Sequence, residues 1–230
     1  MSDLAKHFPT RILSRRALLA VGAIAASAAA AASLPAVAQQ KKGPSEVSVA
    51  ELMQAGPLPD LVLGKADAPV TIVEYASMTC GHCANFHATV LPTLKQKYIE
   101  TGKVRLILRE FPFDTRAAAA SMLARCSGPE KAHDLIAKLF AEQENWAFVQ
   151  TNPAAALFKV AQSAGFNDDS FKKCVGDEKL LQDITNSRDR ANKSFGVNAT
   201  PTFFINGKKL EAASDRIESF DQAIEPLLKK

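Results

Sequence analysis

The formal net charge of +4 belongs mostly to the N-terminus, and the sequence after residue 38 lacks an excess of basic residues. Residues 1–38 hold four basic residues and one acidic residue, so the other 192 residues hold 24 Lys and Arg against 23 Asp and Glu. A nearly neutral chain gives no electrostatic reason to expect a nucleic acid or a membrane surface as a partner. Internal repeats are also absent, and the length suits one domain with an ample core, or a domain with a large insertion.

Cysteine is scarce, and a chain of this length does not need disulfides as a scaffold. The four cysteines are Cys80, Cys83, Cys126 and Cys174. We therefore expect at least one pair to serve chemistry. The sequence also lacks a second Cys-x-x-Cys motif, which would be needed to complete a zinc site with Cys80 and Cys83, so no metal is expected.

The N-terminus has the parts of a secretory signal peptide. A basic stretch precedes an alanine-rich apolar run over residues 17–32 and the small–x–small pattern Ala36-Val37-Ala38. The alternative is an uncleaved membrane anchor, but a spanning helix needs about 20 strongly apolar residues. We therefore expect cleavage near Ala38. The pair Arg15-Arg16 is typical of twin-arginine export signals, although ordinary signals also contain paired arginines.

The next third of the chain predicts a strand–helix–strand unit. A loose lead-in over residues 39–60, with a turn of helix near residue 50, comes before two β-prone runs, at 61–63 and 70–76. After Cys80 the apolar residues follow helical spacing, with a kink expected at Pro92. A further strand follows at 104–111. The Cys-x-x-Cys motif thus lies where the second strand gives way to a helix.

The pattern of the remaining residues predicts a block of helices followed by a second region of β-strands. We expect helices at 115–125, 129–143, 153–165, from 168 or 169, and 177–194, with Ser127 near the second cap and Asp168 or Asp169 capping the fourth. Strands at 202–205 and 208–210 flank the hairpin signal Asn206-Gly207, and Ser214 is expected to cap a final helix. The predicted class is α/β, with a mixed sheet built from 61–112 and 179–230 and a helical insertion over 113–178.

The motif Cys80-Gly81-His82-Cys83 indicates thiol–disulfide chemistry. Cys80 lies at a helix N-terminus, where free N–H groups and the helix dipole favour a thiolate, and a protonated His82 would add a positive charge. Both effects lower the pKa of Cys80 and make it the nucleophile. Cys83, one turn further on, is expected to be buried and to act as the resolving thiol. An inert structural disulfide is the alternative.

Three further features carry hypotheses with open alternatives. Glu74 lies inside an apolar strand and is expected either to accept the proton of Cys83 or to turn to solvent or to Lys97 or Lys103. Thr200-Pro201 precedes the hairpin, where a proline suits an edge position or a cis bond. Cys126 and Cys174 form a second redox pair or a structural disulfide, and the structural reading is favoured. His87 either lines the site or lies on the helix surface.

These residues resemble the DsbA family of bacterial disulfide oxidoreductases. The resemblance rests on the run from Val70 to Ser77 that leads into Cys80-Gly81-His82-Cys83, and on Thr200-Pro201-Thr202-Phe203. It covers nearly all of residues 60–228 and implies a thioredoxin fold with an inserted helical domain. By resemblance Glu74 is the buried acid, Pro201 is a cis-proline facing the disulfide, and the backbone of Thr200 contacts substrate. The pair Cys126 and Cys174 resembles the second, structural disulfide of a subset of the family.

The resemblance also implies a function. It predicts a periplasmic oxidase that introduces disulfides into reduced or unfolded exported proteins, needs no cofactor, and is reoxidised by a membrane quinone-linked partner. Gly81 departs from the proline of the best-known members, which leaves an isomerase or reductase, held reduced by a membrane donor, as the alternative. A thioredoxin-like binding or holdase module is the alternative from another class. Residues 39–60 are too short for an isomerase dimerisation domain, so a monomer is expected.

Overall fold

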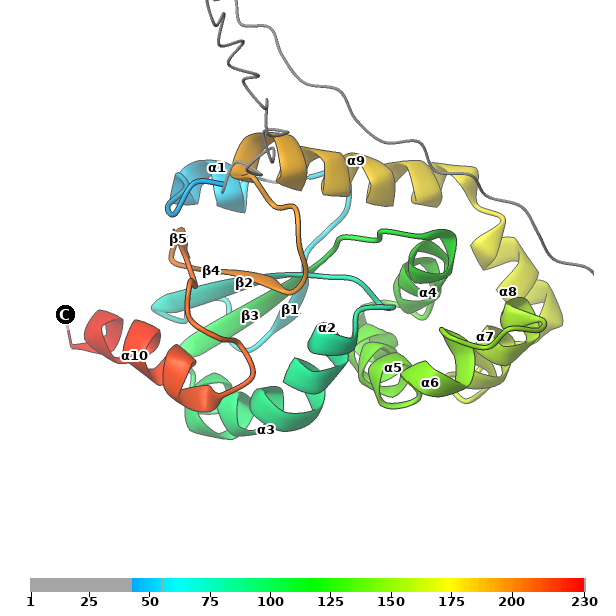
Figure 1. The fold of residues 1–230 in the computed structure, drawn as a ribbon, viewed down its shortest axis with the longest axis horizontal. Helices are drawn as coiled ribbons and strands as arrows, with labels where there is room; N and C mark the ends of the chain where they lie inside the picture. The colour runs from blue at the N-terminus through cyan, green and yellow to red at the C-terminus, as the bar shows by residue number, and fades with distance from the viewer. Residues whose placement is uncertain (1–42, 55, 230) are drawn as a thin grey trace, which may run out of the picture. The chain divides into compact units, whose positions relative to one another are not determined.

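A five-stranded mixed sheet forms the centre of the fold (Figure 1). The computed structural model describes residues 43–54 and 56–229, so the expected signal peptide, its cleavage site near Ala38 and the pair Arg15-Arg16 lie outside the described residues. The strand order is β1-β3-β2-β4-β5, with β2 and β3 parallel and the other pairs antiparallel. The strands are β1 (Leu61–Leu63), β2 (Val70–Ala76), β3 (Val104–Glu110), β4 (Thr202–Ile205) and β5 (Lys208–Lys209).

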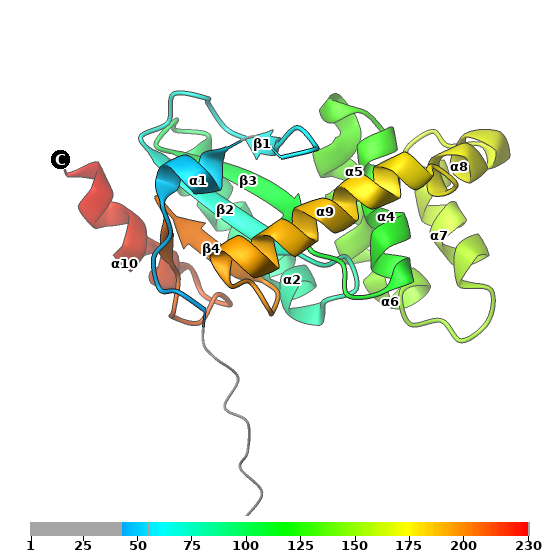
Figure 2. The same ribbon diagram turned by 90° about the horizontal axis from the view of Figure 1, so that it is seen from above.

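The side chains of β2 alternate between two buried faces, as the period of a strand requires. Ile72 packs with Phe86 and Phe220 on one face, whereas Val73 and Tyr75 pack with residues of the opposite face. The first face is covered by the helix that follows Cys80 and by α10 (Ile217–Leu228), and the second by α1 (Val49–Met53) and α9 (Glu178–Phe195) (Figures 1 and 2). Glu74, two residues after Ile72, therefore points toward the helix that carries the cysteines.

The helix after Cys80 is continuous but changes its winding. It runs through α2 (Gly81–Asn85), the π-helical turn η1 (Phe86–Val90), α3 (Leu91–Leu94) and the π-helical turn η2 (Lys95–Ile99). At the end of η1 the N–H of Leu91 bonds to the carbonyl of Phe86, five residues back. This wider turn comes directly before Pro92, which has no N–H to donate. The expected interruption at Pro92 is thus absorbed by a π turn.

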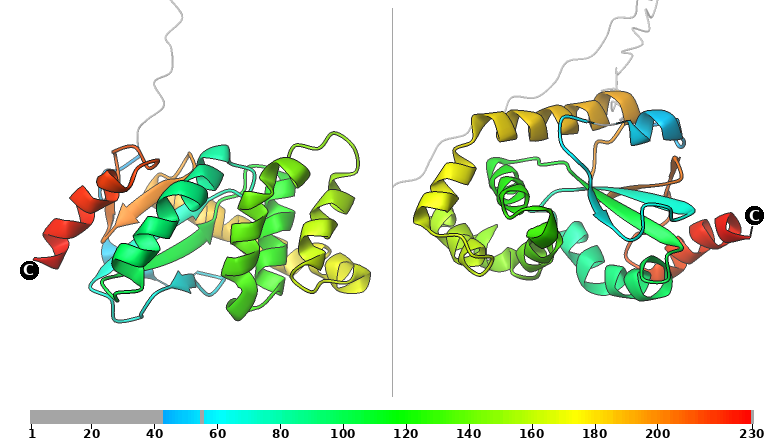
Figure 3. Two further views of the ribbon diagram at one scale, coloured as in Figure 1. Left: turned by 90° about the horizontal axis from the view of Figure 1, so that it is seen from below. Right: turned by 180° about the vertical axis from the view of Figure 1, so that it is seen from behind.

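The helical block between β3 and β4 packs beside one end of the sheet (Figure 3). The long helix α9 leads from the block back across the sheet, and it contacts both α4 and β3. The described residues form one compact unit, and the domain boundaries at 113 and 178 stay a prediction. The block consists of α4 (Thr115–Cys126), α5 (Pro129–Ala141), α6 (Gln143–Trp146), α7 (Pro153–Gln162) and α8 (Asp168–Val175).

Several helix ends differ from the sequence-based expectation. Asn167, rather than Asp168 or Asp169, caps α8, because its side chain and that of Ser170 bond reciprocally to each other's backbone N–H groups. Ser127 ends α4, and α5 begins after Gly128, whose φ of 85° suits glycine. The final helix begins at Ile217 without a side-chain cap, so Ser214 does not cap it.

The lead-in also differs from the expectation of a loose segment. Ser48 caps α1, and Leu52 of α1 is 2% exposed in the core beneath α9. Backbone hydrogen bonds join Val47 to Gly207 and Ser45 to Lys209. These bonds satisfy part of the free edge of the last hairpin, which explains why the segment is ordered against it.

Candidate active site

Cys80 caps the helix that carries Cys83. β2 ends at Ala76, and four residues later the Cys80 sulfur accepts a hydrogen bond from the backbone N–H of Cys83 at 3.4 Å. A sulfur in this position is close to the unpaired N–H groups and the positive end of the helix dipole. Cys80 is half-buried and Cys83 is fully buried, and both are free thiols, so the structure represents the reduced form.

The segment before β4 covers the sulfur of Cys80. β4 pairs with β2 in a register that places Thr202 opposite Tyr75, which brings the preceding residues to the end of β2. The peptide bond between Thr200 and Pro201 is cis. The Cys80 thiol donates a hydrogen bond to the carbonyl of Thr200 at 3.2 Å, while the Thr200 hydroxyl is buried and has no hydrogen-bond partner among the described residues. Two segments 120 residues apart in sequence thus form one site.

The two thiols have opposite proton affinities. A hydrogen bond from Cys83, aided by Thr200 and by the backbone N–H groups of Cys83 and His82, outweighs burial and lowers the pKa of Cys80 to about 5. Burial raises the pKa of Cys83, and its bond to Cys80 and the charge of Glu74 raise it further. At neutral pH the chain therefore holds an accessible Cys80 thiolate beside a protonated Cys83.

Glu74 is completely buried and is paired with a histidine. The Nε2 atom of His87 lies 3.1 Å from both carboxylate oxygens of Glu74, and the side chains are 6% and 0% exposed, respectively. Glu74 does not reach Lys97, which pairs with Asp221 instead. Glu74 thus faces the helix that carries the cysteines, and its charge raises the pKa of Cys83.

The remaining residues expected at the site have distinct positions. His82 is exposed and acts on Cys80 through its backbone N–H. Gln143, which the sequence did not single out, donates to the carbonyl oxygens of Met78 and Cys80 at 2.8 and 3.2 Å. In the sequence, Gln143 was marked only by its place at the end of the helix expected over residues 129–143. Through these bonds α6 holds the loop between β2 and the cysteines.

A surface hollow opens beside Cys80. Its volume is about 370 Å³, and the side chain of Phe113 on its rim is 57% exposed. An exposed aromatic ring next to a reactive sulfur is typical of a surface that receives an apolar chain segment. The hollow is lined by Ser77, Thr79, Cys80, Phe113, Asn198, Ala199 and Thr200.

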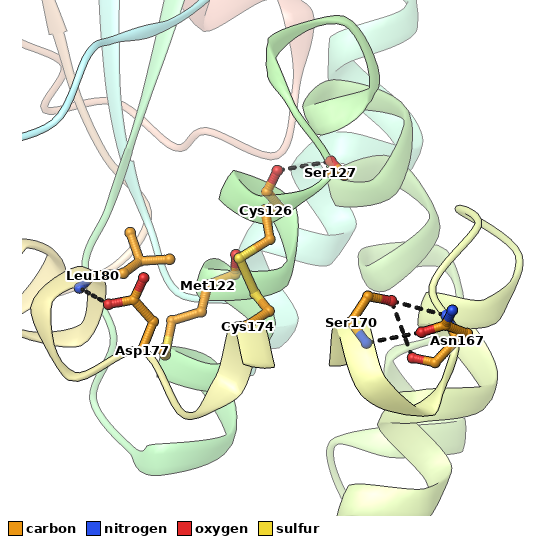
Figure 4. Close-up of a disulfide and its surroundings, with 9 residues drawn as sticks. Met122, Cys126, Ser127, Asn167, Ser170, Cys174, Asp177 and Leu180 are labelled. Atoms are coloured by element: carbon orange, nitrogen blue, oxygen red, sulfur yellow. Dashed lines mark hydrogen bonds between the residues drawn. A yellow bond between two sulfur atoms is a disulfide. The ribbon is translucent and has the colours of Figure 1, made fainter. Parts of the chain in front are cut away.

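Cys126 and Cys174 are bonded to each other in the helical block (Figure 4). The bond joins the last residue of α4 to α8, across 48 residues of sequence, with the Cα atoms 6.1 Å apart. Figure 4 shows the capped starts of α8 at Asn167 and of α9 at Asp177 nearby. Cys126 and Cys174 are therefore bonded to each other, while Cys80 and Cys83 are free thiols.

A Cys-x-x-Cys at a strand-to-helix junction, a cis-proline opposite it and a mixed sheet covered by helices define a thiol–disulfide oxidoreductase of the thioredoxin fold. The family model described as "Thioredoxin" matches residues 58–226, and the chain belongs to that family, in its DsbA-like branch.

Known proteins similar to the chain carry related descriptions. A "putative protein-disulfide oxidoreductase" of Rickettsia bellii is 36% identical over 85% of this chain and 75% of its own length. A "probable disulfide bond formation protein D" of Bacillus cereus is 30% identical over 73% of this chain and 78% of its own. The crystal structure of Wolbachia pipientis α-DsbA1 matches with a TM-score of 0.71 and 33% identity, over 79% of this chain and 96% of that one. The chain spans 62% of the Rickettsia typhi relative.

Proposed function

We propose that the chain is an exported oxidase that introduces disulfides into reduced proteins outside the cytoplasm. The observation that carries this proposal is the position of the Cys80 sulfur as the cap of α2, where it accepts the N–H of Cys83 and its pKa is lowered to about 5. A stabilised Cys80 thiolate favours the reduced form of the enzyme, and a disulfide whose reduced form is stabilised is a strong oxidant. The thiolate is also the better leaving group when a mixed disulfide is resolved.

The proposed reaction has two exchange steps. A substrate thiolate attacks the sulfur of Cys80 in the oxidised enzyme, the bond between Cys80 and Cys83 breaks, and Cys83 leaves and takes a proton. A second substrate thiolate then attacks the substrate sulfur of the mixed disulfide, and Cys80 leaves as a thiolate. The substrate gains a disulfide and the reduced enzyme is left with a Cys80 thiolate and a Cys83 thiol. Glu74 exchanges the proton of Cys83, and Thr200 and Pro201 face the bound substrate.

The partners and location are part of the same proposal. Substrates are reduced or unfolded exported proteins, which the hollow beside Phe113 suits because it is open and partly apolar. Reoxidation requires an acceptor of two electrons, for which we propose a membrane quinone-linked protein. Among the described residues no helix is long and apolar enough to span a membrane. Export to the periplasm rests on the sequence of residues 1–38.

Gly81 favours a second candidate, an isomerase or reductase kept reduced by a membrane donor. Gly81 is exposed, and a side chain added there would meet no atom within 4 Å. The dipeptide between the cysteines tunes the potential, and glycine gives it more freedom than the proline of the best-known relatives.

Equilibration with glutathione separates the two candidates. The oxidase should oxidise a dithiol peptide stoichiometrically, and the potential of its Cys80–Cys83 pair should lie above about −180 mV. A potential near −270 mV, typical of thioredoxin, would replace the oxidase with the reductase. Failure to oxidise any dithiol would support a binding module with inactive cysteines.

A further inference from the structure

His87 is the only hydrogen-bond partner of the Glu74 carboxylate among the described residues. Its Nε2 atom is 3.1 Å from each oxygen, so one imidazole nitrogen is shared between both. A fully buried carboxylate costs several kcal/mol unless it is paired or protonated. His87 is thus the group that compensates the charge of Glu74 inside the fold.

The histidine is held where it is by sequence spacing and by aromatic packing. It lies four residues after Cys83, one helical turn further along the same helix. The imidazole packs against the ring of Phe140 of α5, with ring centroids 4.4 Å apart. It also makes an edge-to-face contact with Phe86, with centroids 5.4 Å apart. With a ring on two sides and the carboxylate on a third, the imidazole has little freedom to rotate.

We propose that His87 is a positioning residue that acts through Glu74 on the proton of Cys83. This proposal rests on the proposed role of Glu74. During closure of the Cys80–Cys83 disulfide, the Cys83 thiol gives its proton to the Glu74 carboxylate. The Cys83 sulfur then attacks the Cys80 sulfur of a mixed disulfide. The sulfur of the bound thiol compound leaves Cys80 with the electron pair of the broken bond. In the reverse direction the same carboxyl group returns the proton to Cys83. His87 holds the carboxylate in one orientation through its bond to both oxygens, so that the carboxylate faces the helix that carries Cys83.

The charged groups around the imidazole support this role. Glu74 faces it from β2, and its charge raises the pKa of Cys83. His133 of α5 lies nearby, and burial, followed by the charges of His87 and Lys95, lowers its pKa, so it is neutral at pH 7. Glu74 is therefore the acidic group to which the imidazole is bonded.

The test measures closure of the Cys80–Cys83 disulfide in the purified chain. Reduced protein is mixed with oxidised glutathione, and acid-quenched samples are analysed by mass spectrometry for the glutathione adduct and for the closed disulfide. Glutathione first attaches at Cys80 and is then expelled by Cys83. In His87→Phe, which keeps an aromatic ring between Phe86 and Phe140, closure should slow about tenfold or more at pH 7 and the adduct should accumulate. In His87→Gln, which keeps an N–H donor, closure should stay within about threefold of the unaltered chain.

Two readouts distinguish this role from a merely structural one. First, the closure rate of His87→Phe should rise about tenfold per pH unit between pH 6 and 8, because hydroxide must then remove the Cys83 proton, whereas the unaltered chain should show a flatter profile. Second, His87→Phe should change closure by less than about twofold in a Glu74→Gln background, since two groups that act as one unit are not additive. The attachment of glutathione to Cys80 should be unchanged throughout.

The outcomes separate the two proposals. If Glu74→Gln is slow but His87→Phe closes within twofold of the unaltered chain, Glu74 keeps its role and the inference about His87 is wrong. If Glu74→Gln itself closes at the normal rate, the proposed role of Glu74 fails. His87→Asn, whose amide is too short to reach both oxygens, serves if His87→Phe does not fold, and closure at the normal rate in that variant would equally overturn the inference.

Discussion

The sulfur of Cys80 accepts a hydrogen bond from the backbone N–H of Cys83 at 3.4 Å, so the reactive atom is itself the cap of the helix that carries its partner. Because a cap accepts N–H groups, it is stabilised when it is an anion. Cys83 lies one turn inside the helix and is buried, where an anion is disfavoured. The start of this helix thus gives two cysteine side chains different pKa values, lowered for Cys80 and raised for Cys83.

The first prediction concerns alkylation of the reduced chain. Iodoacetamide at pH 6 should modify Cys80 at least about 100 times faster than Cys83, because only Cys80 is a thiolate at that pH. Peptide mapping after timed quenching measures both rates. Equal rates, or faster modification of Cys83, would reverse the assignment of nucleophile and resolving thiol.

The second prediction is that reduced protein is more stable than oxidised protein at neutral pH. The pKa of Cys80 is about 5 in the fold and about 8.5 in an unfolded chain. The thiolate therefore contributes stability that is full above pH 8.5 and is lost as the pH falls through 5. Above 8.5 the raised pKa of Cys83 opposes this gain, since unfolding then releases its proton.

Urea unfolding of both redox forms at pH 4, 5.5, 7 and 8 measures this difference, with Cys126–Cys174 kept intact. The midpoint advantage of the reduced form should grow from pH 5 to 8 and disappear by pH 4. An oxidised form that is clearly the more stable at pH 7 would favour the reductase.

The third prediction compares Thr200→Val with His82→Ala. The buried Thr200 hydroxyl has no hydrogen-bond partner of its own among the described residues, and its O–H dipole beside the sulfur lowers the pKa of Cys80, whereas His82 acts through a backbone N–H that alanine retains. Thr200→Val should raise that pKa by about one unit, which is a loss of about 1.4 kcal/mol, and His82→Ala should raise it less. Thiolate absorbance at 240 nm against pH gives both values. A larger shift in His82→Ala would show that its imidazolium charge dominates.

The fourth prediction concerns the bond between Cys126 and Cys174. It closes a loop of 48 residues, which in the chain-entropy model stabilises the fold by about 4 kcal/mol. The double variant Cys126→Ser, Cys174→Ser should unfold at lower denaturant and still oxidise a dithiol peptide at the normal rate. Lost activity in a chain that is still folded would give this pair a part in the reaction.

The fifth prediction concerns the ion pair between Glu110 and Arg125. The Nε and Nη2 atoms of Arg125 donate to the two carboxylate oxygens of Glu110, at 2.5 and 2.7 Å, and the side chains of Glu110 and Arg125 are 1% and 8% exposed. Arg125→Met leaves a buried charge unpaired and should lower the free energy of unfolding by about 3–5 kcal/mol. The double variant Glu110→Gln, Arg125→Met should recover part of the loss, and a single variant as stable as the parent chain would contradict the burial of the pair.

The sequence by itself determined the parts of this protein that depend on local pattern. The apolar run at 70–76, the helical spacing after Cys80 and the turn at Asn206-Gly207 predicted the strands, the helix and the hairpin, because these elements depend on short-range periodicity and turn chemistry. The Cys-x-x-Cys motif predicted the reaction class, because the two sulfurs lie one helical turn apart. Helix caps were less predictable, because several polar residues lie near each helix start and only one of them accepts a hydrogen bond from the free backbone N–H groups.

The tertiary structure alone decided which distant residues complete the site. Thr200 reaches Cys80, and Gln143 reaches the carbonyl of Met78, through contacts over 120 and 65 residues that no local pattern encodes. The sequence left open whether His87 lies on the helix surface or lines the site. Its packing against Phe140 of α5 places it at the site. Its bond to Glu74 exists because alternation in β2 turns the carboxylate toward the cysteine helix, where Phe140 of α5 packs against the imidazole.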